Sequence, residues 1–173
     1  AEQEPFVAIG EIGLDYHHMT ATRKEQINFF EKQLELANKL NLPVVIHNRK
    51  ADDDIRAIIK QWPTVKKVLH CFSSSADYAN SVIDDHTFFS FTGMITEAKK
   101  GKLVNAIKAI PIEHIMLETD CPYLTPIEKK GQENEPAFTS FVAAKIAALK
   151  DLNEILVKKI CSATSQEFFN LSL

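Results

Sequence analysis

Short runs of consecutive apolar residues alternate along the chain with longer segments in which apolar residues recur every three or four positions. The short runs predict strands that are buried on both faces, and the longer segments predict amphipathic helices. The expected strands comprise residues 6–9, 44–46, 68–69, 88–91 and 115–117, and the expected helices comprise residues 22–40, 52–61, 76–83, 98–110, 136–149 and 153–169.

The order of these elements indicates an α/β fold. Strands that alternate with helices of this length predict a parallel sheet with helical crossovers. Because no repeat or linker interrupts the series, we interpret residues 1–173 as a single domain. Five such units fit an open doubly wound sheet, and they also fit an incomplete (β/α)8 barrel of the TIM type. A whole barrel needs roughly 250 residues, so this chain would supply strands four to eight.

Composition places the chain among ordinary globular proteins. It is 45% hydrophobic and 25% charged, and its net charge of −3 gives no overall signal for nucleic acid, although a local basic patch could still bind phosphate. No apolar run approaches the roughly 18 residues of a membrane span. Three widely spaced cysteines are typical of a reduced interior without disulfides, so we expect a cytoplasmic protein with no membrane contact.

Residues that can bind a metal follow four of the five expected strands: Glu11, His47, His70 and Asp120. In parallel α/β proteins the chemistry gathers at the carboxyl ends of the strands, and imidazole and carboxylate are preferred ligands of Zn²⁺ and Mn²⁺. Taken singly, such a histidine is more often a structural residue, and such an acid more often caps a helix. Their shared location favours a metal site, and with it the barrel.

The segments that carry these residues resemble the TatD family of metal-dependent deoxyribonucleases, within the amidohydrolase-like barrels. The matching segments read AIGEIGLDY at residues 8–16, PVVIHNRKADD at 43–53, HCFS at 70–73 and PIEHIMLETDCP at 111–122, and NEP at 134–136 resembles a further family motif. The match covers nearly the whole chain in the family's order.

The resemblance implies a role for each candidate residue. Glu11 would lie between two divalent metal ions (Zn²⁺, Mg²⁺ or Mn²⁺), and His47 and His70 would bind one of them. Asp120 would bind the other and accept the proton of the attacking water, which makes Asp120 and Glu11 the catalytic residues. The implied reaction is hydrolysis of phosphodiester bonds in DNA, as a 3′–5′ exonuclease.

Substrate contacts are expected from three further residues. Arg49 could bind a phosphate oxygen through both guanidinium nitrogens, although a structural ion pair fits its position equally well. Tyr123 is a candidate for base stacking, and Asn134, in the last motif, is expected to bind substrate. Lys99, Lys100 and Lys102 follow the fourth strand and could contact a DNA backbone, whereas a solvated helix start is the simpler interpretation.

The sequence departs from the family pattern at three points. Family members open with a strand that carries a His-x-His pair, and no such pair occurs here. Ser74 and Glu133 stand where the family usually has glycine and arginine. We therefore expect this chain by itself to bind metal weakly and to show little activity. Its open edges would be covered by a missing N-terminal fragment or by self-association, or the chain is a partial gene product.

Two other functions fit the same residues. The barrel and its metal chemistry would also serve a hydrolase of small esters, lactones or amides. An inactive fragment that lacks the His-x-His ligands and binds a partner is the other alternative. Cations near the pocket, Arg49 and the Lys99 cluster, favour DNA as the substrate.

Overall fold

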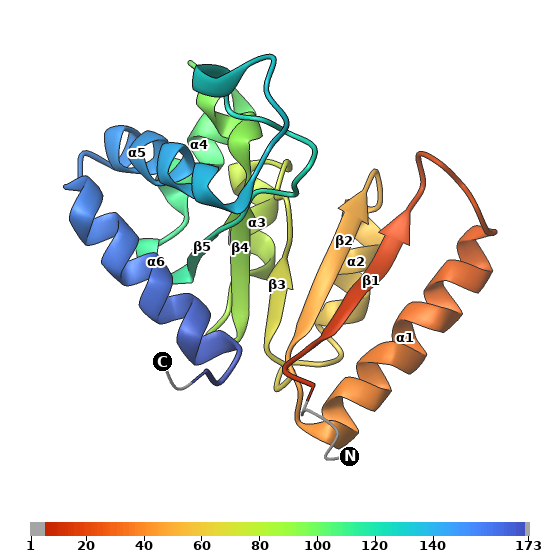
Figure 1. Ribbon diagram of the computed structural model, residues 1–173. Coiled ribbons are helices and arrows are strands. Elements are labelled where there is room, and N and C mark those ends of the chain that lie inside the picture. Colours follow the sequence, from red (N-terminus) through yellow and green to blue (C-terminus); the bar gives the residue numbers. More distant parts are fainter. Residues whose placement is uncertain (1–5, 172–173) are drawn as a thin grey trace, which may run out of the picture.

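The computed structural model describes residues 6–171, and five parallel strands form its sheet in the order β1-β2-β3-β4-β5 (Figure 1). The strands are β1 (Ile9–Asp15), β2 (Val44–Arg49), β3 (Lys67–Leu69), β4 (Thr87–Phe91) and β5 (Ile115–Leu117). Each strand lies beside the one that precedes it in sequence, so the order never reverses as it does in a doubly wound sheet. This confirms the barrel-type α/β fold. The sheet does not close on itself within the described residues, where β1 and β5 are its edges.

Helices connect the strands and build the main core against the sheet (Figure 1). They are α1 (Arg23–Leu40), α2 (Asp52–Ile59), α3 (Ala76–Val82), α4 (Lys102–Ala109), α5 (Thr139–Lys150) and α6 (Glu154–Phe168), with short 3-10 helices η1 (Gly93–Glu97), η2 (Ile112–His114), η3 (Ile127–Lys129) and η4 (Pro136–Phe138). The end of α6 also contacts the opposite face of the sheet through Phe168. No helix in residues 6–171 is both long and apolar enough to cross a membrane. Residues 1–5 and 172–173 of the predicted single domain lie outside the described residues, and the domain assignment stays a prediction.

Helix α1 shows how local sequence sets the bounds of an element. Thr22 caps its first turn by accepting a hydrogen bond from the Glu25 backbone N–H, and the Glu25 carboxylate accepts one from the Thr22 N–H in return. Asn41, in the left-handed conformation, ends the helix. Phe30, Leu34 and Ala37 share one buried face against the sheet, as their spacing predicts.

The two faces of the sheet have different environments. Residues such as Ile46 and Leu69 point toward the helices and belong to the main core. On the concave face, Val68 of β3 and Met116 of β5 form a second apolar cluster with Phe168 from the end of α6. Because side chains alternate along a strand, the next positions on that concave face, toward the carboxyl ends, are His70 directly after β3 and Glu118 directly after β5.

The first strand differs from its predicted bounds. Residues 6–8 are not part of it, and Phe6 is 81% exposed. The strand continues through Glu11 to Asp15, because this polar segment pairs with β2 from the Ile9–Val44 pair to the Asp15–Arg49 pair. The backbone N–H and C=O groups of this segment bond to β2, so the segment forms a strand in spite of its glycines and acids.

A β-bulge in β1 directs Glu11 toward the concave face. The three-residue step from Ile9 to Ile12 lies opposite the two-residue step from Val44 to Ile46, so β1 holds one extra residue. Ile9 and Ile12 can then both pack against the main core, although they are an odd number of positions apart. The extra residue changes the alternation, and Glu11 lies on the same face as the histidines.

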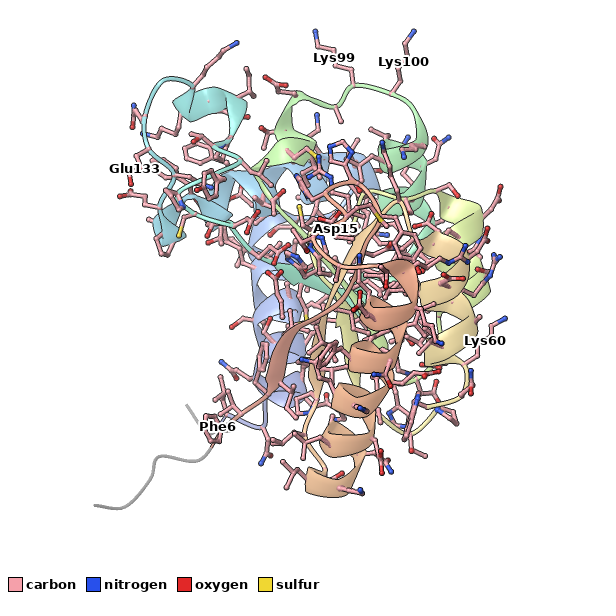
Figure 2. All side chains as sticks on the ribbon, turned by 90° about the vertical axis from the view of Figure 1, so that its right-hand side faces the viewer. Phe6, Asp15, Lys60, Lys99, Lys100 and Glu133 are labelled. Atoms are coloured by element: carbon pink, nitrogen blue, oxygen red, sulfur yellow. The ribbon has the colours of Figure 1, made fainter. Side chains whose placement is uncertain are left out.

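The predicted helix at residues 98–110 begins later than expected. Residues 93–97 form the 3-10 helix η1, and α4 starts at Lys102. The extended Ala98 and Gly101, whose φ is 106°, separate the two helices. Lys99 and Lys100 therefore lie in a loop at the carboxyl-end edge of the sheet (Figure 2).

We expect Gly13→Ala to destabilise the protein strongly. Gly13 has a φ of 133°, and an added Cβ would overlap the backbone carbonyl of its pairing partner His47. Gly131→Ala is the matched control, because its φ is 91° but its Cβ would meet nothing within 4 Å. In urea denaturation the control should lose about 1–2 kcal/mol of unfolding free energy, from backbone strain alone. Gly13→Ala should lose about 3 kcal/mol or more. Equal losses would contradict this account of the strand pair.

Candidate metal centre

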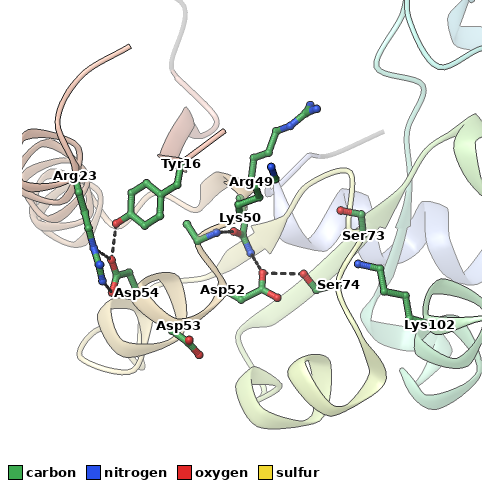
Figure 3. A pocket seen from close by; sticks show the side chains of 12 residues that line it. Tyr16, Arg23, Arg49, Lys50, Asp52, Asp53, Asp54, Ser73, Ser74 and Lys102 are labelled. Carbon is green, nitrogen blue, oxygen red and sulfur yellow. Dashed lines mark hydrogen bonds and ion pairs between the residues drawn. The ribbon is translucent and has the colours of Figure 1, made fainter. Parts of the chain in front are cut away.

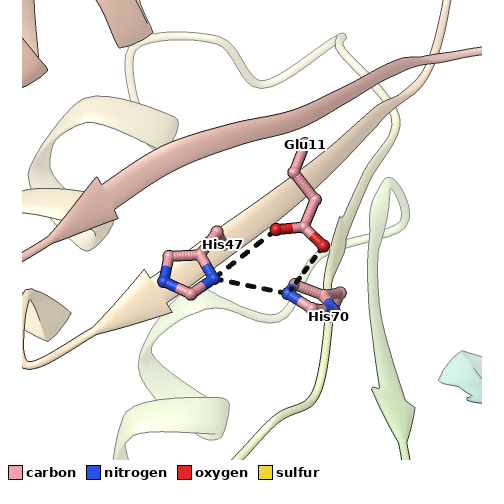
Figure 4. Close-up of side chains that lie close together, drawn as sticks. All are labelled: Glu11, His47 and His70. Atoms are coloured by element: carbon pink, nitrogen blue, oxygen red, sulfur yellow. Dashed lines mark hydrogen bonds and ion pairs between the residues drawn. The ribbon is translucent and has the colours of Figure 1, made fainter. Parts of the chain in front are cut away.

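Three side chains meet on the concave face (Figure 4): one from β1, one from β2 and one from the residue directly after β3. His47 Nδ1 lies 3.6 Å from Glu11 Oε2, and His70 Nε2 lies 3.3 Å from Glu11 Oε1. The two imidazole nitrogens are themselves 3.4 Å apart. The structure thus brings together Glu11, His47 and His70, which are distant in the sequence.

The spacing of these donor atoms fits a divalent metal ion. A tetrahedral ion about 2.1 Å from its ligands separates the ligand atoms from one another by about 3.4 Å. His47 faces one Glu11 oxygen at 3.6 Å and His70 faces the other at 3.3 Å, and one donor atom from each of the three residues lies within 4.8 Å of the others. Two imidazoles and a carboxylate are ligands that Zn²⁺ and Mn²⁺ accept. Spacing and donor chemistry therefore both suit such an ion.

Each histidine has a carboxylate beside its other ring nitrogen. His47 Nε2 is 3.4 Å from Asp15 Oδ2, and His70 Nδ1 is 3.6 Å from Glu118 Oε2. Metal-ligating histidines usually have such a partner, which fixes the tautomer and makes the ligating nitrogen more basic. Asp15 and Glu118 were not among the predicted site residues. The alternation along β1 from Glu11 to Asp15 was the available signal for the first of them.

Both of these carboxylates are held by backbone groups. The N–H groups of His17 and His18 each donate to Asp15 Oδ1 at 2.8 Å, and His18 Nδ1 lies 2.6 Å from Asp15 Oδ2. The Cys71 N–H donates to Glu118 Oε1 at 2.5 Å. Partial burial works to raise the pKa of Asp15, but these hydrogen bonds outweigh it and hold the pKa well below its usual value.

The acidic surroundings act on His70 and on Cys71 in the same direction. Burial works against protonation of His70, but the carboxylates of Glu118, Glu11 and Asp120 outweigh it and raise its pKa. Burial raises the pKa of the Cys71 thiol to about 11, so this cysteine stays protonated at neutral pH.

Asp120 lies near this cluster without belonging to it. Its charge raises the pKa values of His70 and Cys71. However, Asp120 is exposed and has a left-handed φ of 56°. Glu118 is the acid that faces His70. Met116 on β5 points into the concave face, so alternation turns residue 118 toward the histidines. The assignment of Asp120 as a metal ligand stays a prediction.

The residues expected to bind substrate occupy contrasting environments. Tyr123 is 72% exposed, and Arg49 is exposed at the end of β2. Asn134 is only 5% exposed, and its amide donates to the backbone oxygens of Thr119 and Tyr123. Asn134 therefore ties together the loop that carries Asp120 and Tyr123. A role for these three residues in substrate binding stays a prediction.

Comparison with known proteins relates the whole chain to one family. A family model described as TatD related DNase matches residues 1–170. A protein of Bacillus subtilis (strain 168) named "Uncharacterized metal-dependent hydrolase YabD" is 36% identical over 171 residues, which cover 98% of this chain and 67% of that protein. A Klebsiella pneumoniae (strain 342) protein named "3'-5' ssDNA/RNA exonuclease TatD" is 37% identical over 155 residues, covering 86% of this chain and 59% of that protein.

A solved structure has the same fold. The crystal structure of YJJV, a TATD homolog from Escherichia coli K12, superposes with a TM-score of 0.88 at 28% identity, covering 96% of this chain and 64% of that one. The chain thus spans about two thirds of the length of the relatives that it matches.

We expect Glu118→Gln to weaken metal binding by about 10- to 100-fold, because the amide no longer makes the His70 imidazole more basic. The amide oxygen can still accept the Cys71 N–H, so the fold should be kept. Glu113→Gln is the matched control, since Glu113 is exposed just before β5, at the strand's other end. Calorimetric titration of the two variants with Zn²⁺ or Mn²⁺ measures the effect. Wild-type affinity in Glu118→Gln would contradict the assigned role.

Proposed function

The chain belongs to the TatD-related DNase family, and on this premise we propose that the protein is a divalent-metal-dependent hydrolase. Its substrates would be the phosphodiester bonds of DNA, cleaved from the 3′ end. The observation that carries the proposal is the convergence of Glu11, His47 and His70, with a carboxylate behind each imidazole. The name of the Klebsiella pneumoniae relative supports a nuclease, and it mentions RNA beside single-stranded DNA.

Glu11, His47 and His70 are proposed to hold a Zn²⁺, Mg²⁺ or Mn²⁺ ion. Such an ion lowers the pKa of water, orients the phosphate and stabilises the charge that develops on its oxygens. Asp15 and Glu118 position the imidazoles. On the same face, Val68 and Met116 form an apolar cluster next to these donors.

Asp120 is the proposed proton acceptor for the attacking water, and it would also ligate a second ion. Its carboxylate is exposed at the carboxyl-end edge of the sheet, where a substrate can reach it. The left-handed backbone of Asp120 and the following turn, in which the Tyr123 N–H donates to the Asp120 carbonyl at 3.0 Å, fix its position.

Substrate contacts are proposed for the exposed groups around this edge. The Arg49 guanidinium would bind a phosphate oxygen with two N–H groups. Tyr123 offers an exposed ring on which a base can stack, and sequence-tolerant stacking suits a nuclease. Asn134 would act on the substrate by holding the loop that carries Tyr123.

Removal of the metal or of one ligand should abolish the activity. With 5′-labelled single-stranded DNA, and with protein and metal concentrations high enough for the low activity expected of this chain by itself, we expect progressive shortening in Mn²⁺, Mg²⁺ or Zn²⁺, none in excess EDTA, and recovery when the ion is returned. His70→Ala should lower the rate by at least about 100-fold. His17→Ala is the control, because His17 is an exposed histidine outside the cluster. EDTA-resistant cleavage, or full activity of His70→Ala, would contradict the proposal.

Asp120→Asn should lower kcat by about 10²- to 10⁴-fold, because asparagine cannot accept the proton. Asp151→Asn is the matched control and should keep the wild-type kcat. Asp151 is also an exposed aspartate with a left-handed φ, 55° compared with 56° for Asp120. The kcat and KM of both variants on the same oligonucleotide, measured across pH, separate proton transfer from binding. An unchanged kcat and pH profile in Asp120→Asn would overturn the assignment.

A further inference from the structure

A cavity of about 500 Å³ lies at the carboxyl-end edge of the sheet (Figure 3). Segments that follow β1, β2, β3 and β4 all contribute to its wall. Tyr16 comes from the first, residues 48–54 from the second, Ser73 and Ser74 from the third, and Lys102 from the start of α4. This edge is where a parallel α/β protein binds its ligands.

The three acidic residues of the wall already have partners. Asp52 Oδ1 accepts hydrogen bonds from Asn48 and Ser74 at 2.8 Å each. Asp54 accepts two from Arg23 at 2.7 Å and one from the Tyr16 hydroxyl at 2.5 Å. The third acid, Asp53, is paired with Arg56 at 2.6 Å. Arginines therefore balance the charges of Asp53 and Asp54, whereas the partners of Asp52 are neutral groups.

Three cations of the same wall have no such partner. Within residues 6–171, the side chains of Arg49, Lys50 and Lys102 make no hydrogen bond or ion pair. Arg49 extends away from the aspartates, and Lys102 extends toward Ser73 (Figure 3). The charges of Lys50 and Arg49 also lower the pKa of His17 nearby. Three cations stand against the single uncompensated charge of Asp52, so the net charge of the cavity wall is positive, which suits an anion.

The cavity adjoins the metal centre along two chain segments. Arg49 follows His47 by two residues on β2, about 6.6 Å along the strand and on the same face. Ser73 follows His70 by three residues, in the loop between β3 and α3. An extended strand of nucleic acid held at Glu11, His47 and His70 can thus reach the cavity with its next phosphate.

We propose that this cavity is a second phosphate subsite, in which Lys50 and Lys102, together with Arg49, bind the phosphate next to the scissile one. The Ser73 hydroxyl is exposed beside them and can donate to the same group. The inference rests on the proposed function and narrows it, because a flanking phosphate exists only in a polynucleotide. A small ester or amide has nothing to place there.

Binding of a fluorescein-labelled single-stranded DNA oligonucleotide tests the subsite. It is followed by anisotropy in EDTA, where the proposed reaction does not proceed, over a range of salt concentrations. Lys102→Gln and Lys50→Gln should each weaken binding about three- to tenfold. Each should also reduce the slope of log K against log salt by about 0.7, the value for one lost contact with a single strand.

Lys60→Gln is the charge-matched control, because Lys60 is an exposed lysine at the far end of α2 from the cavity (Figure 2). It should bind the oligonucleotide as the wild type does, and thermal melting should show all three variants folded. Equal weakening in the three variants would mean that the overall charge of the protein, and not a local site, attracts the oligonucleotide. That result would overturn the proposed subsite. Wild-type binding by Lys102→Gln and Lys50→Gln would overturn it as well.

A second substrate separates failure of the subsite from failure of the proposed function. Bis(4-nitrophenyl) phosphate is a phosphodiester with no flanking phosphate, so its hydrolysis by the wild-type protein, and the loss of that hydrolysis in His70→Ala, depend on the metal centre alone. Hydrolysis of this ester without the predicted loss of oligonucleotide binding would reject the subsite only. No hydrolysis of either substrate would reject the proposed function.

Discussion

The pairing of β1 with β2 is the constraint on which the candidate metal centre depends. A shift of one residue in a strand turns all its side chains to the opposite face. The bulge between Ile9 and Ile12 shifts the register of β1 against β2 by one residue. As a result, Ile9 and Ile12 both face the core, while Glu11 faces the histidines. Gly13 then lets β1 approach the backbone of His47 closely, which sets the position of Glu11 relative to His47.

Charge is segregated along the edge of the sheet that carries the chemistry. Carboxylates surround the two imidazoles, whereas the unpartnered cations Arg49, Lys50 and Lys102 lie in the neighbouring cavity. A metal cation would therefore meet carboxylates, and a phosphate would meet cationic side chains, at positions only a few residues apart in the sequence. The net charge of −3 conceals this arrangement, because it sums over both regions.

The sequence predicted most of the architecture, because hydrophobic periodicity is a local property. The alternation of buried strands with amphipathic helices gave the parallel fold, and a capped helix such as α1 was predicted to within one residue. The segment from Glu11 to Asp15 was misjudged, since its glycines and acids are typical of a loop. Pairing with β2 stabilises it as a strand, and that pairing is not encoded in its own residues.

For the site, the sequence by itself determined the chemistry: imidazole and carboxylate donors at the carboxyl ends of the strands. Tertiary structure decided which donors meet. Glu11, His47 and His70 come together, while Glu118 rather than Asp120 faces His70, because the direction of Met116 sets the alternation after β5. The cavity beside them, too, exists only in the fold, since residues from four separate segments build it. Contacts between distant segments depend on register and side-chain direction, which no local pattern specifies.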